Sequence, residues 1–293
     1  MTVDLSEILK RDEPLSGHTS FGIGGPARLF YEPRTEEQAV EVVRSCRRDG
    51  EPLFVLGGGT NLLVRDEGID GAVVSLRKSS AIRFEGRRAR VDAGASFPRL
   101  VSEGVTRGCG GADALVGIPG TVGGALVMNA GGRYGELCRF VERVRVVDRE
   151  GVARTLSREE AGFGYRTSKL GEFVILGADL AFPEGDREAA RARLREIIVE
   201  KSRTQPLAAR SAGCVFKNPA PRIAAGRLID EAGFKGKIIG GALVSPVHAN
   251  FLVNRRGARA SDILGLIREI KDRVRERNGV ELELEIKIWP APM

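Results

Sequence analysis

The glycine-rich tract GIPGTVGGALVMNAGG, residues 117–132, constrains the fold of this chain more than any other stretch. Six of its sixteen residues are glycine, with apolar residues spaced among them. Glycine allows positive φ angles and a close approach of the backbone to another group, and consecutive backbone N–H groups can bind an anion. The tract is therefore expected to form a tight turn or to hold a ligand, and its length favours the ligand.

A second glycine cluster, Gly57-Gly-Gly-Thr-Asn61, directly follows an apolar segment at 53–56 that reads as a buried strand. It has the placement of a phosphate-binding loop but lacks the G-K-[ST] ending, which disfavours P-loop kinase chemistry. The formal G-x-G-x-x-A match that starts at Gly22 contains Pro26 and follows no apolar strand, so we reject a Rossmann interpretation. Two glycine clusters in different lobes suggest one elongated ligand, such as a dinucleotide.

Composition indicates an enzyme-sized globular protein and excludes several other classes. The chain has 293 residues, of which 42% are apolar and 29% charged, and no apolar run approaches the roughly 18 residues of a membrane span. The N-terminal stretch lacks the apolar core of a signal peptide, so a cytoplasmic protein without a membrane partner is predicted. The net charge of +7 mixes basic with 39 acidic residues and only 5% aromatic residues. An anionic small molecule accounts for this charge as well as a nucleic acid does, and no nucleic-acid partner is predicted.

The cysteine and histidine content argues against a metal centre. The four cysteines are scattered without a C-x-x-C pair, and only two histidines are present. This pattern is typical of reduced thiols in a reducing compartment, not of a zinc site or a disulfide framework. We therefore predict no bound metal.

Hydrophobic periodicity and capping residues predict an α+β fold. Residues 1–80 alternate strands with a helix that starts at Thr35, and residues 81–195 are richer in strands. A charged helix at about 187–202 contains the predicted domain boundary. In the final third we expect strands at 211–216, 238–244, 249–253 and 280–288, a helix at about 224–232 and a helix capped by Ser261.

Eight motifs, taken in order, resemble those of the UDP-N-acetylenolpyruvoylglucosamine reductase family, and the resemblance covers nearly the whole chain. They are TSFGIGGPAR (19–28), LGGGTNLLV (56–64), the glycine tract (117–132), GYRTS (164–168), SAGCVFKNP (211–219), GRLIDEAGFKG (226–236), HANFLVN (248–254) and LELEIKIW (282–289).

The resemblance implies a two-lobed FAD-binding domain of the vanillyl-alcohol-oxidase/PCMH type at 1–195, with lobes at about 1–80 and 81–195. A smaller α+β substrate-binding domain would occupy 196–293. In such enzymes NADPH reduces FAD, and flavin N5 then gives hydride to the enolpyruvyl group of UDP-N-acetylglucosamine enolpyruvate, which forms UDP-N-acetylmuramate for peptidoglycan. The residues implied to bind FAD are Gly57, Gly58, Gly59, Thr60, Asn61, Leu62, Ile118, Pro119, Gly120, Thr121, Gly123, Gly124 and Asn129.

Three residues match the catalytic positions of the family. Arg166 and Glu285 would stabilise charge that develops on the substrate carboxylate during hydride addition. Alternation places Glu283 on the same strand face as Glu285, so periodicity does not separate them and only the motif favours Glu285. Cys214 occupies the position where the family commonly has a serine proton donor, and an unperturbed thiol with a pKa of about 8.5 is mostly protonated at neutral pH.

The same resemblance implies substrate-binding roles for Tyr165, Lys217 and Asn218. The segment NAGGRYG is one residue longer than usual between its asparagine and its tyrosine, which leaves the roles of Arg133 and Tyr134 open. No obligate protein partner is predicted. Two alternatives remain: an FAD oxidase or dehydrogenase acting on a different sugar, and a basic nucleotide- or RNA-binding module without catalysis.

Overall fold

A computed structural model describes residues 4–290, so the outermost three residues of each predicted domain, 1–3 and 291–293, lie outside the described residues. The chain divides into two compact units, each built from several separate segments. Unit 1 comprises the described residues of Met1–Asp12, Arg28–Gly58 and Asp70–Val199, and unit 2 those of Glu13–Ala27, Gly59–Ile69 and Glu200–Met293. The predicted boundary near residue 195 stays a prediction, although two segments before it, 13–27 and 59–69, group with the C-terminal residues.

A four-stranded sheet with the order β1-β2-β5-β3 lies mainly in unit 1. Helix α1 begins where the sequence predicts. Thr35 is its N-cap residue, and Thr35 Oγ1 accepts a hydrogen bond of 3.2 Å from Gln38 N. Strands β3 and β5 are parallel, with Leu53 opposite Ala72. The elements are β1 (Leu9–Pro14), β2 (Pro26–Tyr31), α1 (Glu36–Arg48), β3 (Leu53–Leu56) and β5 (Ile69–Ser75).

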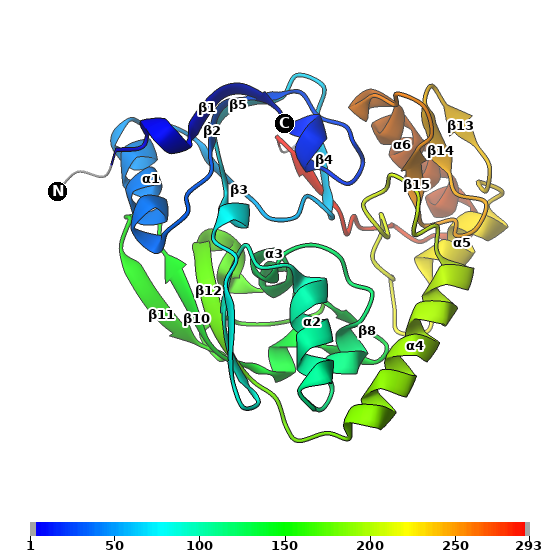
Figure 1. Cartoon of the computed structure of the whole chain (residues 1–293). Coiled ribbons are helices and arrows are strands. Elements are labelled where there is room, and N and C mark those ends of the chain that lie inside the picture. Colours follow the sequence, from blue (N-terminus) through cyan, green and yellow to red (C-terminus); the bar gives the residue numbers. More distant parts are fainter. Residues whose placement is uncertain (1–3, 291–293) are drawn as a thin grey trace. The chain divides into compact units, whose positions relative to one another are not determined.

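Unit 1 also contains a five-stranded sheet with the order β11-β10-β12-β7-β6. Its strands are antiparallel, and β10 pairs with both β11 and β12. Helix α3 contacts β7 and β12, and α1 lies beside the β10–β11 hairpin (Figure 1), where Arg47 pairs with Glu150 at 2.7 Å. The elements are β6 (Ile82–Glu85), β7 (Arg88–Asp92), α2 (Phe97–Thr106), α3 (Val122–Val127), β8 (Gly131–Gly132), β9 (Gly135–Glu136), β10 (Val141–Val147), β11 (Ala153–Ser157) and β12 (Val174–Ala181).

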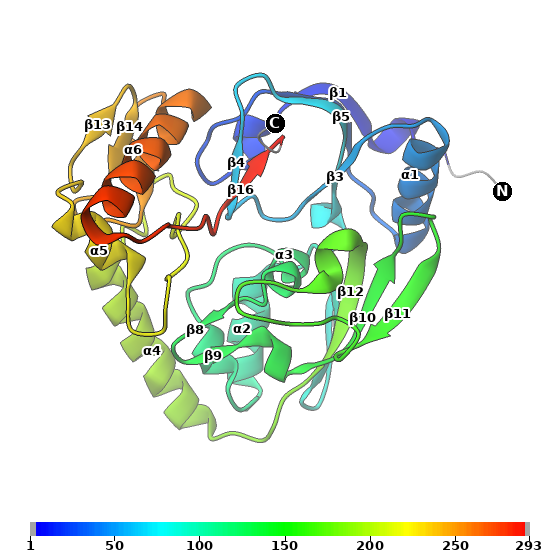
Figure 2. The same cartoon turned by 180° about the vertical axis from the view of Figure 1, so that it is seen from behind.

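Unit 2 has its own apolar core, and the long helix α6 is central to it. One face of this helix, which includes Ile263, Leu266 and Ile270, is buried in this core. Figure 2 shows α6 beside α5 and the small β13–β14–β15 sheet, and it shows β16 next to β4. The elements are β4 (Leu62–Val64), α5 (Ala225–Glu231), β13 (Ile238–Ile239), β14 (Ala242–Val244), β15 (Leu252–Asn254), α6 (Ala260–Asn278) and β16 (Lys287–Trp289). Helix α4 (Arg187–Thr204) begins in unit 1 and ends in unit 2.

Three local predictions for the final third are wrong. Residues 211–216 form no strand and contribute only single bridges, such as Cys214 opposite Phe251. The expected strand at 280–288 is confined to β16, although Leu282 and Ile286 are buried as its alternation predicted. Ser261 lies inside α6 instead of capping it, because Arg259 is the N-cap residue.

Within residues 4–290, none of the helices has the length and apolar character that a membrane span requires.

Candidate functional site

Gly57 and Gly58 of the second glycine cluster lie directly against the glycine tract within unit 1. A Cβ atom on Gly58 would lie 2.6 Å from Gly120 Cα, and one on Gly57 would lie 2.9 Å from Thr121 Oγ1. Atoms of a real side chain are not tolerated at 2.6 Å from backbone. The absence of a side chain at position 58 is therefore what allows the two loops to meet.

The glycine tract is held in place by backbone hydrogen bonds to the segment around α2. Gly120 O accepts from Phe97 N at 3.0 Å, and Gly123 N donates to Ala93 O at 2.8 Å. Thr121 is the N-cap residue of α3, with its hydroxyl 3.5 Å from Gly124 N. Of the other predicted cofactor residues in this tract, Ile118 is half-buried and Pro119 is exposed.

The second half of the other glycine loop belongs to unit 2. Gly59 has a φ of +66°, and a Cβ atom there would lie 2.0 Å from His18 O. Ser20 N donates to Gly59 O at 3.0 Å. The segment around His18 therefore supports the loop, a role that sequence reasoning missed because no local pattern connects it to residue 59.

Backbone N–H groups in this loop fit an anionic ligand. The N–H groups of Gly58, Gly59 and Thr60 donate to no acceptor within residues 4–290. Such groups need a partner once they are removed from water, and a pyrophosphate can provide acceptors for several of them. The residues present therefore fit the dinucleotide FAD that the sequence predicts here.

The predicted catalytic residues Cys214 and Glu285 lie in neighbouring segments of unit 2. Val215 O accepts from Glu285 N at 2.8 Å, so the backbone of the residue after Cys214 is hydrogen-bonded to the backbone of Glu285. Asn61 Nδ2 donates to Glu285 O at 3.0 Å, which connects the end of the glycine loop to the same segment. Leu62 is buried in β4, opposite Lys287.

The environments of Glu283 and Glu285 differ in a way that alternation did not reveal. The Glu283 side chain is 75% exposed and pairs with Lys217 Nζ at 3.3 Å. Glu285 is half-buried. Of the two acids, Glu285 has the setting expected of a group that contacts a bound substrate, and Glu283 instead holds the predicted substrate-binding lysine.

Asn250 fixes the backbone around Cys214, and sequence reasoning did not identify it. Its buried side chain accepts from Phe216 N at 2.9 Å and donates to Phe216 O at 2.8 Å. His248 Nδ1 accepts from Asn250 N at 3.2 Å. Burial, assisted by the charge of Lys235, lowers the pKa of His248 and favours its neutral form.

Arg166 lies in a tight turn of unit 1 with a φ of +55°. Gly164 and Thr167 close this turn, with Gly164 N donating to Thr167 O at 2.9 Å. The guanidinium lies 5.2 Å from the ring centre of Tyr165, whose side chain is 52% exposed. Arg166 belongs to unit 1, whereas Cys214 and Glu285 belong to unit 2.

Asn218, a predicted substrate-binding residue, and Tyr134, whose role the sequence left open, both have contacts within the protein. Asn218 Oδ1 accepts from Ala225 N at 3.1 Å at the start of α5, which leaves its amide nitrogen for a ligand. In the lengthened NAGGRYG segment, the Tyr134 ring lies under the guanidinium of Arg133 at 4.6 Å and that of Arg193 at 5.9 Å. Tyr134 thus contacts α4, which provides a structural role for a residue whose function the sequence left open.

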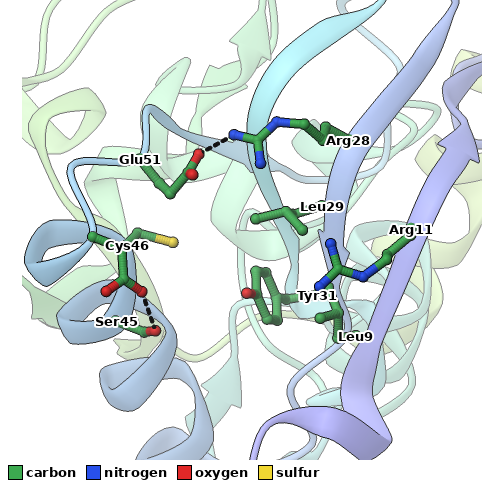
Figure 3. A pocket seen from close by; sticks show the side chains of 9 residues that line it. Leu9, Arg11, Arg28, Leu29, Tyr31, Ser45, Cys46 and Glu51 are labelled. Carbon is green, nitrogen blue, oxygen red and sulfur yellow. Dashed lines mark hydrogen bonds and ion pairs between the residues drawn. The ribbon is translucent and has the colours of Figure 1, made fainter.

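A pocket of about 270 Å³ lies elsewhere in unit 1, between α1 and strands β1 and β2. None of the predicted site residues lines it. Figure 3 shows Arg28 paired with Glu51 at one end and the Cys46 thiol near the Tyr31 ring. Burial raises the pKa of Cys46 to about 11, so this thiol stays protonated. Within residues 4–290, no group of side chains could hold a metal ion.

Comparisons with known proteins agree with the fold and the glycine loops. A family described as "FAD binding domain" matches residues 27–157, and the family "UDP-N-acetylenolpyruvoylglucosamine reductase, C-terminal domain" matches residues 205–289. With the mixed α+β architecture, these matches define an FAD-dependent oxidoreductase with a PCMH-type cofactor domain.

Individual relatives identify the family. A UDP-N-acetylenolpyruvoylglucosamine reductase from Heliobacterium modesticaldum is 42% identical over 98% of this chain and 93% of its own length. The one from Desulfosudis oleivorans is 41% identical over 98% and 96%. The crystal structure of the Thermus caldophilus enzyme has a TM-score of 0.81 at 39% identity and covers 94% of this chain and 97% of that chain. The chain belongs to the UDP-N-acetylenolpyruvoylglucosamine reductase family, whose members act in peptidoglycan precursor synthesis.

Family membership decides between a flavin-dependent enzyme and a binding module without catalysis, which the sequence left open. The chain is a flavin-dependent oxidoreductase, and the alternative of a basic binding module without catalysis is wrong.

Proposed function

We propose that this enzyme converts UDP-N-acetylglucosamine enolpyruvate to UDP-N-acetylmuramate, with NADPH as the reductant. The observation that carries the proposal is the pairing of the Cys214–Val215 and Glu285 segments in unit 2, where Glu285 N donates to Val215 O. This pairing supports the proposal, because the proposed proton donor Cys214 and the carboxyl-bearing Glu285 lie on adjacent backbone segments. Both segments lie within residues 205–289, which match the family described as "UDP-N-acetylenolpyruvoylglucosamine reductase, C-terminal domain".

The residues proposed to hold FAD are those of the two glycine loops. Unpaired N–H groups at Gly58, Gly59 and Thr60 would donate to the pyrophosphate. Residues Ile118 to Gly124 of the glycine tract, which meets Gly58 within unit 1, would also contact FAD. When FAD is bound, its chemistry is to transfer a hydride from NADPH to the methylene carbon of the enolpyruvyl group.

The chain's own residues supply charge stabilisation and a proton. Arg166 as a cation and Glu285 as a hydrogen-bond-donating acid would bind the substrate carboxylate and stabilise the negative charge that hydride addition places on it. The Cys214 Sγ–H bond then breaks as its proton passes to the carbon next to the carboxylate, which yields the lactyl ether, and solvent reprotonates the thiolate. Tyr165, Lys217 and the amide nitrogen of Asn218 would contact the sugar and its phosphates.

The thiol assignment is tested by stopped-flow measurement of the two half-reactions. In Cys214→Ala, NADPH should bleach the flavin at the wild-type rate, while reoxidation by the enolpyruvyl substrate slows about 100-fold or more. Cys214→Ser should retain substantial turnover because a hydroxyl can also donate the proton. Cys109→Ala, which removes a buried thiol of unit 1, serves as the control.

Normal steady-state turnover of Cys214→Ala would show that Cys214 is not the proton donor. The substrate assignment has its own test, in which NADPH oxidation is measured with and without UDP-N-acetylglucosamine enolpyruvate. Oxidation that responds to another sugar, but not to this substrate, would favour the alternative of a different flavin dehydrogenase. A cytoplasmic location remains part of the proposal, because the four cysteines of the sequence are scattered without a C-x-x-C pair. The absence of a nucleic-acid, membrane or obligate protein partner is also part of the proposal.

A further inference from the structure

The side-chain amide of Asn129, in the second half of the glycine tract, makes three hydrogen bonds within unit 1. Its Nδ2 group donates to Gly164 O at 3.0 Å and to Glu136 Oε2 at 3.2 Å. Its Oδ1 atom accepts from Cys138 N at 3.1 Å. The residue is only 1% exposed. With both N–H bonds committed to acceptors, the Asn129 amide has no hydrogen-bond donor left for the cofactor.

The Gly164 carbonyl begins the turn that carries Arg166. The other end of this turn is held by Ser168, whose hydroxyl donates to Val127 O at 2.9 Å. Val127 and Asn129 both lie in the segment that ends α3. Two side-chain hydrogen bonds therefore fasten both ends of the Arg166 turn to the last residues of the glycine tract.

Backbone conformation points to the same pair of residues. Within residues 4–290, only Asp12, Asn129 and Arg166 are non-glycine residues with positive φ, at 51°, 40° and 55°. Arginine has no local side-chain interaction that favours this conformation. Such conformations persist where the surrounding structure enforces them, and they cluster at functional sites. The carbonyl that Asn129 holds lies two residues before Arg166.

We propose that Asn129 is a positioning residue that acts through Arg166. Its carboxamide fixes the Gly164 carbonyl, and this contact keeps the turn closed and holds Arg166 in the left-handed conformation that directs its guanidinium. The inference rests on the proposed role of Arg166 at the substrate carboxylate. It assigns to the Asn129 side chain a function in the oxidative half-reaction, beyond the cofactor contact that its place in the glycine tract implies.

Asn129→Gly tests this role without adding strain, because glycine adopts a φ of 40° readily and lacks only the three side-chain bonds. We expect reoxidation of the reduced flavin by the enolpyruvyl substrate to slow about tenfold. Bleaching of the flavin by NADPH should stay within about twofold of wild type. Thr35→Ala, which removes the cap of α1, controls for a loss of stability alone and should leave both rates unchanged.

A double-mutant cycle separates positioning from a general structural role. If Asn129 acts through Arg166, then Asn129→Gly combined with Arg166→Ala should reoxidise no more slowly than Arg166→Ala alone. Multiplicative losses in the double variant would overturn the proposal, and so would a wild-type reoxidation rate in Asn129→Gly.

Hydrogen exchange of the protein without substrate gives a readout that does not depend on turnover. The Thr167 amide, which donates to Gly164 O at 3.4 Å, should exchange faster in Asn129→Gly. If that variant fails to fold, Ser168→Ala releases the other end of the turn and should have the same effect. Unchanged exchange at Thr167 in the folded variants would refute the proposal. Normal reoxidation in Arg166→Ala would instead refute the proposed role of Arg166, while exchange at Thr167 still decides whether Asn129 holds the turn.

Discussion

At the scale of single residues, Asp66 acts as a remote cap for the longest helix of unit 2. Its two carboxylate oxygens accept from Ala260 N at 2.7 Å and Ser261 N at 3.1 Å. Burial raises the pKa of this carboxyl, but the hydrogen bonds from Ala260 and Ser261 outweigh burial, and the net effect lowers the pKa below its ordinary value. The negative charge also lies at the N-terminus of the helix, where the helix dipole favours it.

Asp66→Ala should lower the free energy of unfolding by about 1–2 kcal/mol at neutral pH, as loss of a helix cap does. Because the folded-state pKa is depressed, this contribution is complete above the unfolded-state pKa of about 4 and is lost as the pH falls through the folded-state value. Urea unfolding of both proteins between neutral and acidic pH measures it. Glu67→Ala is the neighbouring control, with a change within about 0.5 kcal/mol. A constant difference between wild type and Asp66→Ala down to low pH would contradict the role of the charge.

Gly58 is the residue at which the two glycine loops come closest. In Gly58→Ala the new Cβ would lie 2.6 Å from Gly120 Cα, so the loops must separate. We expect the purified variant to lose most of its bound FAD, measured as the ratio of flavin to protein absorbance. Gly132→Ala is the control, in the glycine tract that Gly58 contacts, because a Cβ atom there has no neighbour within 4 Å. Full flavin content in Gly58→Ala would show that the contact is not needed for the cofactor.

Residue-scale predictions from sequence succeeded where the determining contacts are local. Thr35 caps α1 through a bond to a residue three positions away, which a local pattern can identify. Ser261 was predicted as a cap because it precedes an apolar pattern, but the carboxylate that caps this helix comes from Asp66, almost two hundred positions earlier. No local pattern contains that partner, so the sequence could not identify it.

At the scale of elements, the strand at 141–147 follows a local pattern, whereas the strand expected at 211–216 is absent and the one expected at 280–288 is confined to β16. Residues 141–147 alternate and also pair on both sides, with β11 and β12. Residues 280–288 alternate as well, but their burial comes from packing Leu282 and Ile286 into the core of unit 2. Alternation indicates which side chains are buried but not whether a neighbouring strand is present. It therefore predicted a longer strand than the structure has.

Helix α4 is anchored to unit 1 through an ion pair with a buried carboxylate. Arg193 Nε lies 3.5 Å from Asp113 Oδ2, whose side chain is 7% exposed, and the same guanidinium lies over Tyr134. Arg193→Ala should destabilise the protein by about 1–2 kcal/mol, because it removes the ion-pair partner of the buried Asp113 carboxylate. Amide exchange in the first half of α4 should increase as well.

Arg191→Ala provides the control on the same helix, because Arg191 pairs only with the exposed Glu188 among the contacts seen in residues 4–290. Such surface pairs contribute about 0–1 kcal/mol. Equal thermal midpoints for the two variants would show that the Asp113 contact does not anchor α4.

At the scale of the whole molecule, the sequence motifs predicted the family and the cofactor class better than they predicted the course of the chain. The glycine loops and the later motifs indicated a flavoenzyme, and the comparisons confirm it. The division into units was not predictable, because segments 13–27 and 59–69 join residues from the far end of the chain. Their partners are set by tertiary pairing, such as Leu62 with Lys287.

The pairing of β4 with β16 has a consequence for synthesis of the protein on the ribosome. Strand β4 is made early, yet its parallel partner Lys287–Trp289 is among the last parts of the described chain to be translated. Until then Leu63, which is fully buried in the finished protein, has no strand beside it. Unit 2 therefore completes this pairing only after residues 287–289 have left the exit tunnel, and Leu63 stays without its partner strand until then.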